Sequence, residues 1–229
     1  LFKGIGWRML LASTVACSSL KDNHDGDTKT NASTDETHPN AASYPESGEW
    51  FFGMDSVLVQ ATENNGLKSY TIQSTHPPRD DGPAQRQFSE SLGDPILRSG
   101  NLLTDALFAM AVVEASENAV SQIQDDAFGQ AKNCECFQTG ALWNWVWTRD
   151  IAYATELGLS WLDTERAKNA LLFKLSERKE GGNLQIVQDT GTGGSWPVST
   201  DRVTWARGAM AVLNHTSDTA FRETVIEAF

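Results

Sequence analysis

The strongest constraint on the fold of this chain is the helical spacing of its apolar side chains after residue 100. The first such run carries one apolar stripe, made of Leu103, Ala106, Leu107, Met110 and Val113. Further apolar side chains fill much of the opposite face of the same helix. A helix that is apolar nearly all round is expected to be buried between two layers.

Four further helices are expected downstream. The second begins near Asp150, the third follows an N-cap at Asp163, the fourth follows residues 199–200 and the last follows Ser217. No sequence repeat indicates a solenoid. We therefore expect a mainly α domain over residues 96–229, built from helical hairpins that are joined by long loops.

A smaller β element is expected before these helices. Three short apolar runs lie at 50–52, 57–59 and 70–72, and Asn64-Asn65-Gly66 between the last two is a good hairpin turn. Residues rich in Pro, Gly and Asp follow the third run. The segment 49–95 therefore predicts a small β element and a loop.

The N-terminus has the pattern of an export signal. Lys3 and Arg8 precede a short apolar stretch that ends in small residues and Cys17. The stretch is far shorter than the roughly 20 residues that span a bilayer. Residues 1–17 resemble a lipoprotein signal, which implies acylation of Cys17 and a membrane-anchored protein of the cell envelope, on its periplasmic or surface face. The alternative is an ordinary secretory peptide with an incidental cysteine.

The composition bounds the partners of the chain. Residues 18–48 are polar and acidic, which predicts a disordered linker. The net charge of −12 argues against a nucleic-acid partner and is compatible with a neutral glycan. The chain starts with leucine and stops at Phe229 inside an apolar-periodic run, so we expect a fragment of a longer protein.

Two further cysteines, Cys134 and Cys136, are separated by one residue. A disulfide at that spacing closes a very small ring and would be strained, which leaves free thiols or a metal site as alternatives. Two thiolates without nearby histidines make a poor zinc site. We assign this pair no function and expect neither a metal nor a cofactor.

A candidate binding site lies in residues 143–150, Trp-Asn-Trp-Val-Trp-Thr-Arg-Asp. Indole faces stack on the C–H face of a sugar ring, the Arg149 guanidinium offers paired donors, and the Asp150 carboxylate accepts hydrogen bonds from vicinal hydroxyls. The alternative is structural: Asp150 caps its helix, Arg149 pairs with it, and the tryptophans are core.

A second loop repeats this design. Residues 191–202 form a Gly-rich segment that reaches Trp196 and then Asp201 at a helix start, and glycines allow close backbone approach to a ligand. Asp201 could instead offset the helix dipole. We expect the two loops to converge on one pocket, whose substrate-binding residues are Trp147, Arg149, Asp150, Trp196 and Asp201.

These residues carry a resemblance. Residues 147–152, Trp-Thr-Arg-Asp-Ile-Ala, resemble the Trp-Thr-Arg-Asp segment of glucoamylase-type glycoside hydrolases, members of the six-hairpin glycosidase superfamily. The loop from Trp196 to Asp201, followed by Arg207, is similar to the family's next Trp…Pro…Asp…Arg segment, with different spacing. The resemblance covers about residues 97–229 and implies the opening hairpins of an (α/α)6 toroid. It also implies that Arg149 and Asp150 bind hydroxyls of a terminal sugar.

The resemblance implies an exported glycoside hydrolase that acts on an oligo- or polysaccharide. Such hydrolysis normally needs two carboxyl groups that flank the scissile bond. The family's catalytic glutamates have no match in this sequence, so the catalytic acid and base stay unassigned. One alternative is a polysaccharide lyase that uses Tyr153 and Arg149. The other is a glycan-binding lipoprotein of the envelope without enzymatic activity.

Overall fold

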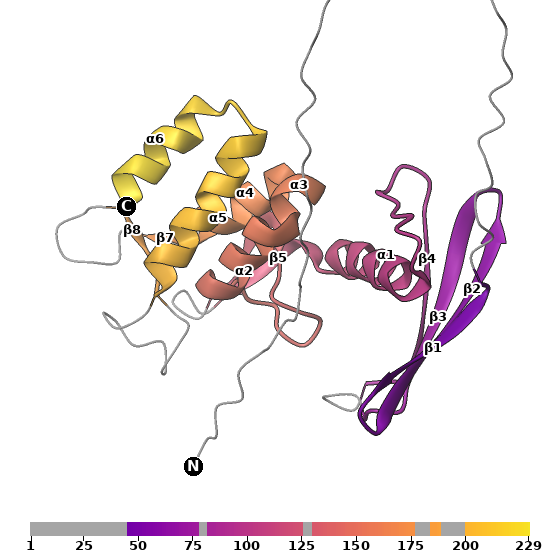
Figure 1. Ribbon diagram of the computed structural model, residues 1–229. Helices are drawn as coiled ribbons and strands as arrows, with labels where there is room; N and C mark the ends of the chain where they lie inside the picture. The colour runs from indigo at the N-terminus through magenta and orange to yellow at the C-terminus, as the bar shows by residue number, and fades with distance from the viewer. Residues whose placement is uncertain (1–44, 78–81, 126–129, 177–183, 189–199) are drawn as a thin grey trace, which may run out of the picture. The chain divides into compact units, whose positions relative to one another are not determined.

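Figure 1 shows the computed structural model of the chain. The residues that the structure describes are 45–77, 82–125, 130–176, 184–188 and 200–229. The predicted signal peptide with its lipidation site Cys17, nearly all of the predicted linker, and Trp196 lie outside these residues. Among the described residues, none of the helices has the length and apolar character needed to cross a membrane.

The fold is mixed α/β. Helices take up 42% and strands 30% of the described chain, and the strands pair antiparallel. The prediction of a mainly α domain that opens an (α/α)6 toroid is therefore wrong. Two segments that were expected to be loops contain a strand and a β-hairpin, described below, and two short strands later in the chain were not predicted either.

The predicted β element is a four-stranded antiparallel sheet in the order β1-β2-β3-β4. Its strands are β1 (Ser47–Phe52), β2 (Asp55–Asn64), β3 (Leu67–Ser74) and β4 (Gln85–Ser89). The predicted turn joins β2 to β3 at Asn65 and Gly66, which have φ of 53° and 79°, as a two-residue hairpin requires. Strand β4 lies where a loop was expected, and its Phe88 is buried opposite Tyr70. One large apolar residue gives no sequence period, so β4 had no detectable signal.

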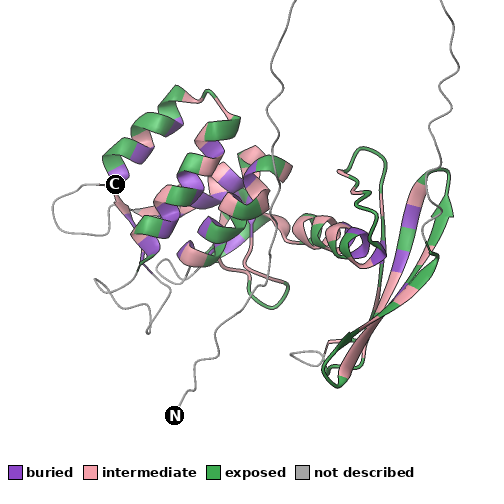
Figure 2. Ribbon diagram, viewed as in Figure 1, coloured by how far each residue is buried: buried purple, intermediate pink, exposed green. Residues whose placement is uncertain are grey.

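Helix α1 (Leu102–Glu117) packs on this sheet. Asn101 caps it by accepting from the Thr104 amide, and its Leu102, Ala106 and Ala109 share a core cluster with Val59 and Tyr70 of the sheet. The opposite face is not covered within the described chain, and Leu107 is 43% exposed. The helix thus buries one face, visible in Figure 2, instead of lying between two layers.

A β-hairpin follows α1, in the second place where a loop was expected. It pairs β5 (Ala119–Asp125) with β6 (Gln130–Phe137). In β6, buried Cys134 and Cys136 alternate with exposed Asn133 and Glu135, a period of two that marks a strand. From the sequence, these cysteines were expected to form a strained disulfide, to be free thiols or to bind a metal, and their place as small apolar residues on the inner face of a strand was not predicted.

The remaining elements are mostly helical. They are α2 (Thr148–Ala154), the π-helical η2 (Thr155–Leu159), α3 (Ser160–Leu162), α4 (Thr164–Phe173), the short strands β7 (Leu175–Ser176) and β8 (Gln185–Ile186), α5 (Asp201–His215) and α6 (Thr219–Ala228). The predicted N-cap Asp163 accepts from the Arg166 amide at 3.0 Å. Trp205 is fully buried in their shared core and donates its indole N–H to the Leu171 carbonyl at 3.0 Å.

Candidate functional site

Strand β6 leads directly into the segment that carries the three neighbouring tryptophans. Thr139 fixes this segment from its start: its amide and its hydroxyl both donate to the Trp145 carbonyl, at 2.8 and 2.9 Å. The Trp147 amide donates back to the Thr139 hydroxyl at 3.2 Å. The Trp143 amide donates to the Gly140 carbonyl at 2.8 Å. The loop is therefore held by hydrogen bonds of its own backbone and of the Thr139 hydroxyl. Thr139 was not predicted from the sequence, because an isolated threonine forms no recognisable pattern.

The three indoles form one cluster, here called the indole cluster (Trp143, Trp145 and Trp147). The Trp143 ring centroid lies 5.2 Å from that of Trp147 and 6.4 Å from that of Trp145. Trp143 is 46% exposed and the other two are partly exposed, whereas Val146 between them is buried. The alternative in which these tryptophans are sealed in a dry core is therefore not what the structure contains.

An ion pair between Arg149 and Asp201 connects the start of α2 with the start of α5. The Arg149 Nη2 and Nε atoms lie 3.0 and 3.2 Å from the same Asp201 carboxylate oxygen, Oδ1. Asp201 begins α5 and Arg149 lies in the first turn of α2, so residues 52 positions apart in the sequence are in direct contact. The expected convergence of Arg149 and Asp201 is present.

The burial of the two partners differs, and this separates their roles. The Asp201 side chain is fully buried, whereas the Arg149 side chain is 30% exposed. A buried carboxylate that holds a guanidinium is positioned to orient that group rather than to contact a ligand itself. The geometry therefore favours Asp201 as a positioning residue and Arg149 as a contact residue.

Asp150 and Thr148 complete the start of α2. The N-cap is Trp147 and not Asp150, whose carboxylate is exposed in the first turn of the helix. The Thr148 hydroxyl is buried and donates to the Val187 carbonyl at 2.6 Å. This hydrogen bond anchors the first turn of α2 in the interior. Asp150 is exposed and follows the indole cluster directly in the sequence.

Other carboxylates near this surface are engaged elsewhere. Glu156 of η2 forms an ion pair with Arg207 of α5, the arginine that the resemblance pointed to. Asp189, a further carboxylate close in sequence to the second loop, lies outside the described residues, as does Trp196. Within the ranges that the structure describes, no group of three or more His, Cys, Asp or Glu side chains could hold a metal ion.

No family model matches this chain, and no curated protein or solved structure matches it either.

Proposed function

We propose that the indole cluster, Arg149 and Asp150 form a binding surface for the terminal sugar of an oligo- or polysaccharide. The observation that carries this proposal is the Arg149–Asp201 pair, at 3.0 Å, at the helix start that follows the partly exposed indoles. An apolar core does not need a buried carboxylate that aims a guanidinium at the surface. A sugar needs an aromatic face with donors and acceptors fixed beside it.

Each group has a defined task in this proposal. Trp143, the most exposed indole of the indole cluster, stacks on the C–H face of the ring. Arg149 donates to ring hydroxyls, and its orientation is set before the ligand arrives because Asp201 already holds it, which lowers the entropic cost of binding. The Asp150 carboxylate accepts hydrogen bonds from hydroxyls.

We further propose that the protein is an exported glycoside hydrolase, on the resemblance of residues 147–152. Asp201 and Glu156 are both engaged in ion pairs with arginines, and neither is given a role as general acid or base. The catalytic acid and base therefore stay unassigned. The disulfide between Cys134 and Cys136 supports export, since disulfides persist in oxidising compartments.

The binding proposal is tested by titrating the full chain with a panel of neutral and uronate-containing glycans in a calorimeter. Trp143→Ala and Arg149→Ala are each expected to raise the dissociation constant by about tenfold or more. Arg222→Ala, which removes an exposed cation of α6, is the matched control and should leave binding unchanged. If the wild-type chain binds no glycan of the panel, or if Trp143→Ala binds as tightly as wild type, the surface is not a sugar site.

The hydrolysis proposal has a separate readout, the products formed from a glycan that binds. New reducing ends without a new double bond support hydrolysis. An unsaturated product, detected by its ultraviolet absorbance, indicates a lyase. Binding without any product indicates a glycan-binding protein and removes the enzyme assignment while it leaves the site intact.

A further inference from the structure

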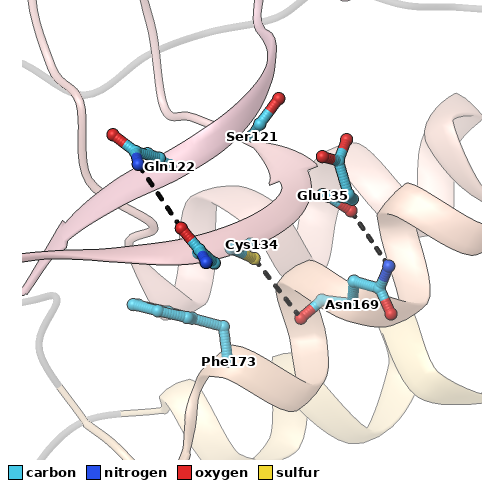
Figure 3. Close-up of a pocket in the computed structure, with 7 residues that line it drawn as sticks. Ser121, Gln122, Cys134, Glu135, Asn169 and Phe173 are labelled. Carbon is cyan, nitrogen blue, oxygen red and sulfur yellow. Dashed lines mark hydrogen bonds between the residues drawn. The ribbon is translucent and has the colours of Figure 1, made fainter.

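A second chemically distinctive place in the molecule is the disulfide between Cys134 and Cys136 in β6. The two sulfurs are in different surroundings. Cys136 is fully buried in the hydrophobic core, whereas Cys134 is 9% exposed and lines an open cleft, shown in Figure 3. Of the two cysteines, Cys134 is therefore the one that a reagent from solution can approach through the cleft.

The cleft is lined by both polar and apolar groups from three elements. Ser121 and Gln122 come from β5, and Asn169 and Phe173 come from α4 (Figure 3). The Asn169 side-chain amide donates to the Glu135 carbonyl at 3.0 Å, which fixes α4 beside the strand that carries the disulfide. The side-chain amides beside Cys134 also carry acceptor oxygens for the backbone N–H groups of an approaching peptide.

A purely structural role explains this disulfide poorly. A cross-link stabilises a fold mainly by closing a loop in the unfolded chain, and its effect grows with loop length. Here the cysteines are two positions apart, which is nearly the smallest loop possible. Both lie on the same strand, so the bond joins no two elements that the β5–β6 ladder does not already join.

The geometry of the β5–β6 hairpin also allows the two cysteines to move apart when the disulfide is reduced. Val120 pairs with Cys136 and Gln122 pairs with Asn133, so β6 carries one extra residue opposite Ser121. Such a bulge leaves the ladder locally unpaired. The Cα atoms of the two cysteines are 5.2 Å apart, against about 6.6 Å for the same step in a regular strand. The cysteines can therefore separate without the loss of a regular part of the ladder.

We propose that Cys134–Cys136 is a thiol–disulfide exchange site, entered at the Cys134 sulfur from the cleft by a dithiol reductant. A thiolate of the reductant attacks the Cys134 sulfur, the Cys134–Cys136 bond breaks, and its electron pair leaves with the Cys136 sulfur, which takes up a proton. The second thiolate of the reductant then attacks the mixed disulfide and releases Cys134 as a thiol. The reductant loses two electrons and two protons, which the two cysteines gain.

The first test measures reduction of the native full chain by dithiothreitol, with alkylation and mass spectrometry of the peptide that contains both cysteines, which separates them from Cys17. Ser121→Tyr should fill the cleft and slow the reduction about tenfold, because exchange rates depend on access to the attacked sulfur. Ala131→Tyr, on an exposed position of the same hairpin outside the cleft, should react like wild type. Circular dichroism and melting check that both variants fold.

The second test needs no variant of this protein. A thioredoxin-like reductant whose second cysteine is replaced by serine traps the mixed disulfide, and the trapped bond is expected on Cys134. Three results would overturn the proposal: trapping on Cys136, reduction that requires urea, or equal rates for Ser121→Tyr and Ala131→Tyr. Free thiols in protein isolated from an oxidising compartment would overturn it as well.

Discussion

Glu90 shows how a single residue can organise a segment without regular secondary structure. Its side chain is 4% exposed, and its carboxylate accepts from the Arg98 guanidinium at 2.7 Å, the Lys68 amide at 2.8 Å and the Tyr70 hydroxyl at 3.0 Å. Burial alone would raise the pKa of Glu90, but these hydrogen bonds outweigh it and lower that pKa below its ordinary value. Burial of the phenol and, after it, the hydrogen bond to Glu90 raise the pKa of Tyr70.

The lowered pKa of Glu90 predicts a pH-dependent stability. A carboxyl group with a lower pKa in the folded state stabilises the fold above its unfolded pKa of about 4.3. This contribution is lost as the pH falls through the folded pKa. Glu90→Gln should therefore reduce the free energy of unfolding by about 2 kcal/mol at pH 7, and by less at pH 3. Urea unfolding at both pH values measures this, and an equal difference at both would contradict the assignment.

Asp201 is the second residue whose burial makes a definite prediction. Asp201→Asn leaves the Arg149 guanidinium without its buried counter-charge and should lower the free energy of unfolding by roughly 3 kcal/mol. Glu156→Gln is the matched control, since its partner Arg207 is 60% exposed, and it should cost less than about 1 kcal/mol. Guanidinium-chloride unfolding compares the two. Equal losses of unfolding free energy in the two variants would mean that burial does not make the Arg149–Asp201 pair more important to stability than the Arg207–Glu156 pair.

At the scale of elements, the contact of α2 with α5 depends on one glycine. A Cβ atom added to Gly208 of α5 would lie 3.0 Å from the Ala152 carbonyl oxygen and 3.2 Å from the Ala152 Cα. These are backbone atoms and cannot rotate away. The close approach brings the Arg149 end of α2 to the Asp201 end of α5, so the geometry of the candidate site depends on this packing.

The substitution Gly208→Ala therefore has two opposing effects on the stability of the fold. Helix propensity favours alanine by about 1 kcal/mol, whereas overpacking typically costs about 1–3 kcal/mol. Because the contact is with backbone, we expect a net loss of stability and a lower melting temperature. Gly158 of η2 has no neighbour within 4 Å of the added Cβ, so Gly158→Ala should be neutral or stabilising. A higher melting temperature for Gly208→Ala would show that the two helices separate easily.

Elements that depend on neighbouring residues could be predicted from the sequence, and elements that depend on distant contacts could not. The N-cap at Asp163, the helix starts near 150, 200 and 217, and the turn at Asn65-Gly66 were predicted, because each depends on neighbouring residues. Strands β4 and β5–β6 were not predicted. Their inner faces use few large apolar side chains, and their burial comes from contacts with distant parts of the chain.

At the scale of the whole molecule, the described chain contains two hydrophobic clusters. One joins the four-stranded sheet to α1, and the other joins the β5–β6 hairpin to the helices α2, α4, α5 and α6. The expectation of an (α/α)6 toroid came from the resemblance of two short segments, residues 147–152 and the loop from Trp196 to Asp201 with Arg207. A motif of six residues specifies local chemistry and does not specify what packs on the surrounding helices, and this is why the predicted fold class failed.

The sequence by itself determined the residue types at the candidate site, the loop-to-helix junctions that carry them, and most helix starts, because these depend on local propensity and capping. Tertiary structure alone decided that Asp201 is buried against Arg149 while Trp143 is exposed, and that Cys134 and Cys136 face inward from a strand. Burial depends on which distant segments meet, and no local pattern in a single sequence encodes that choice.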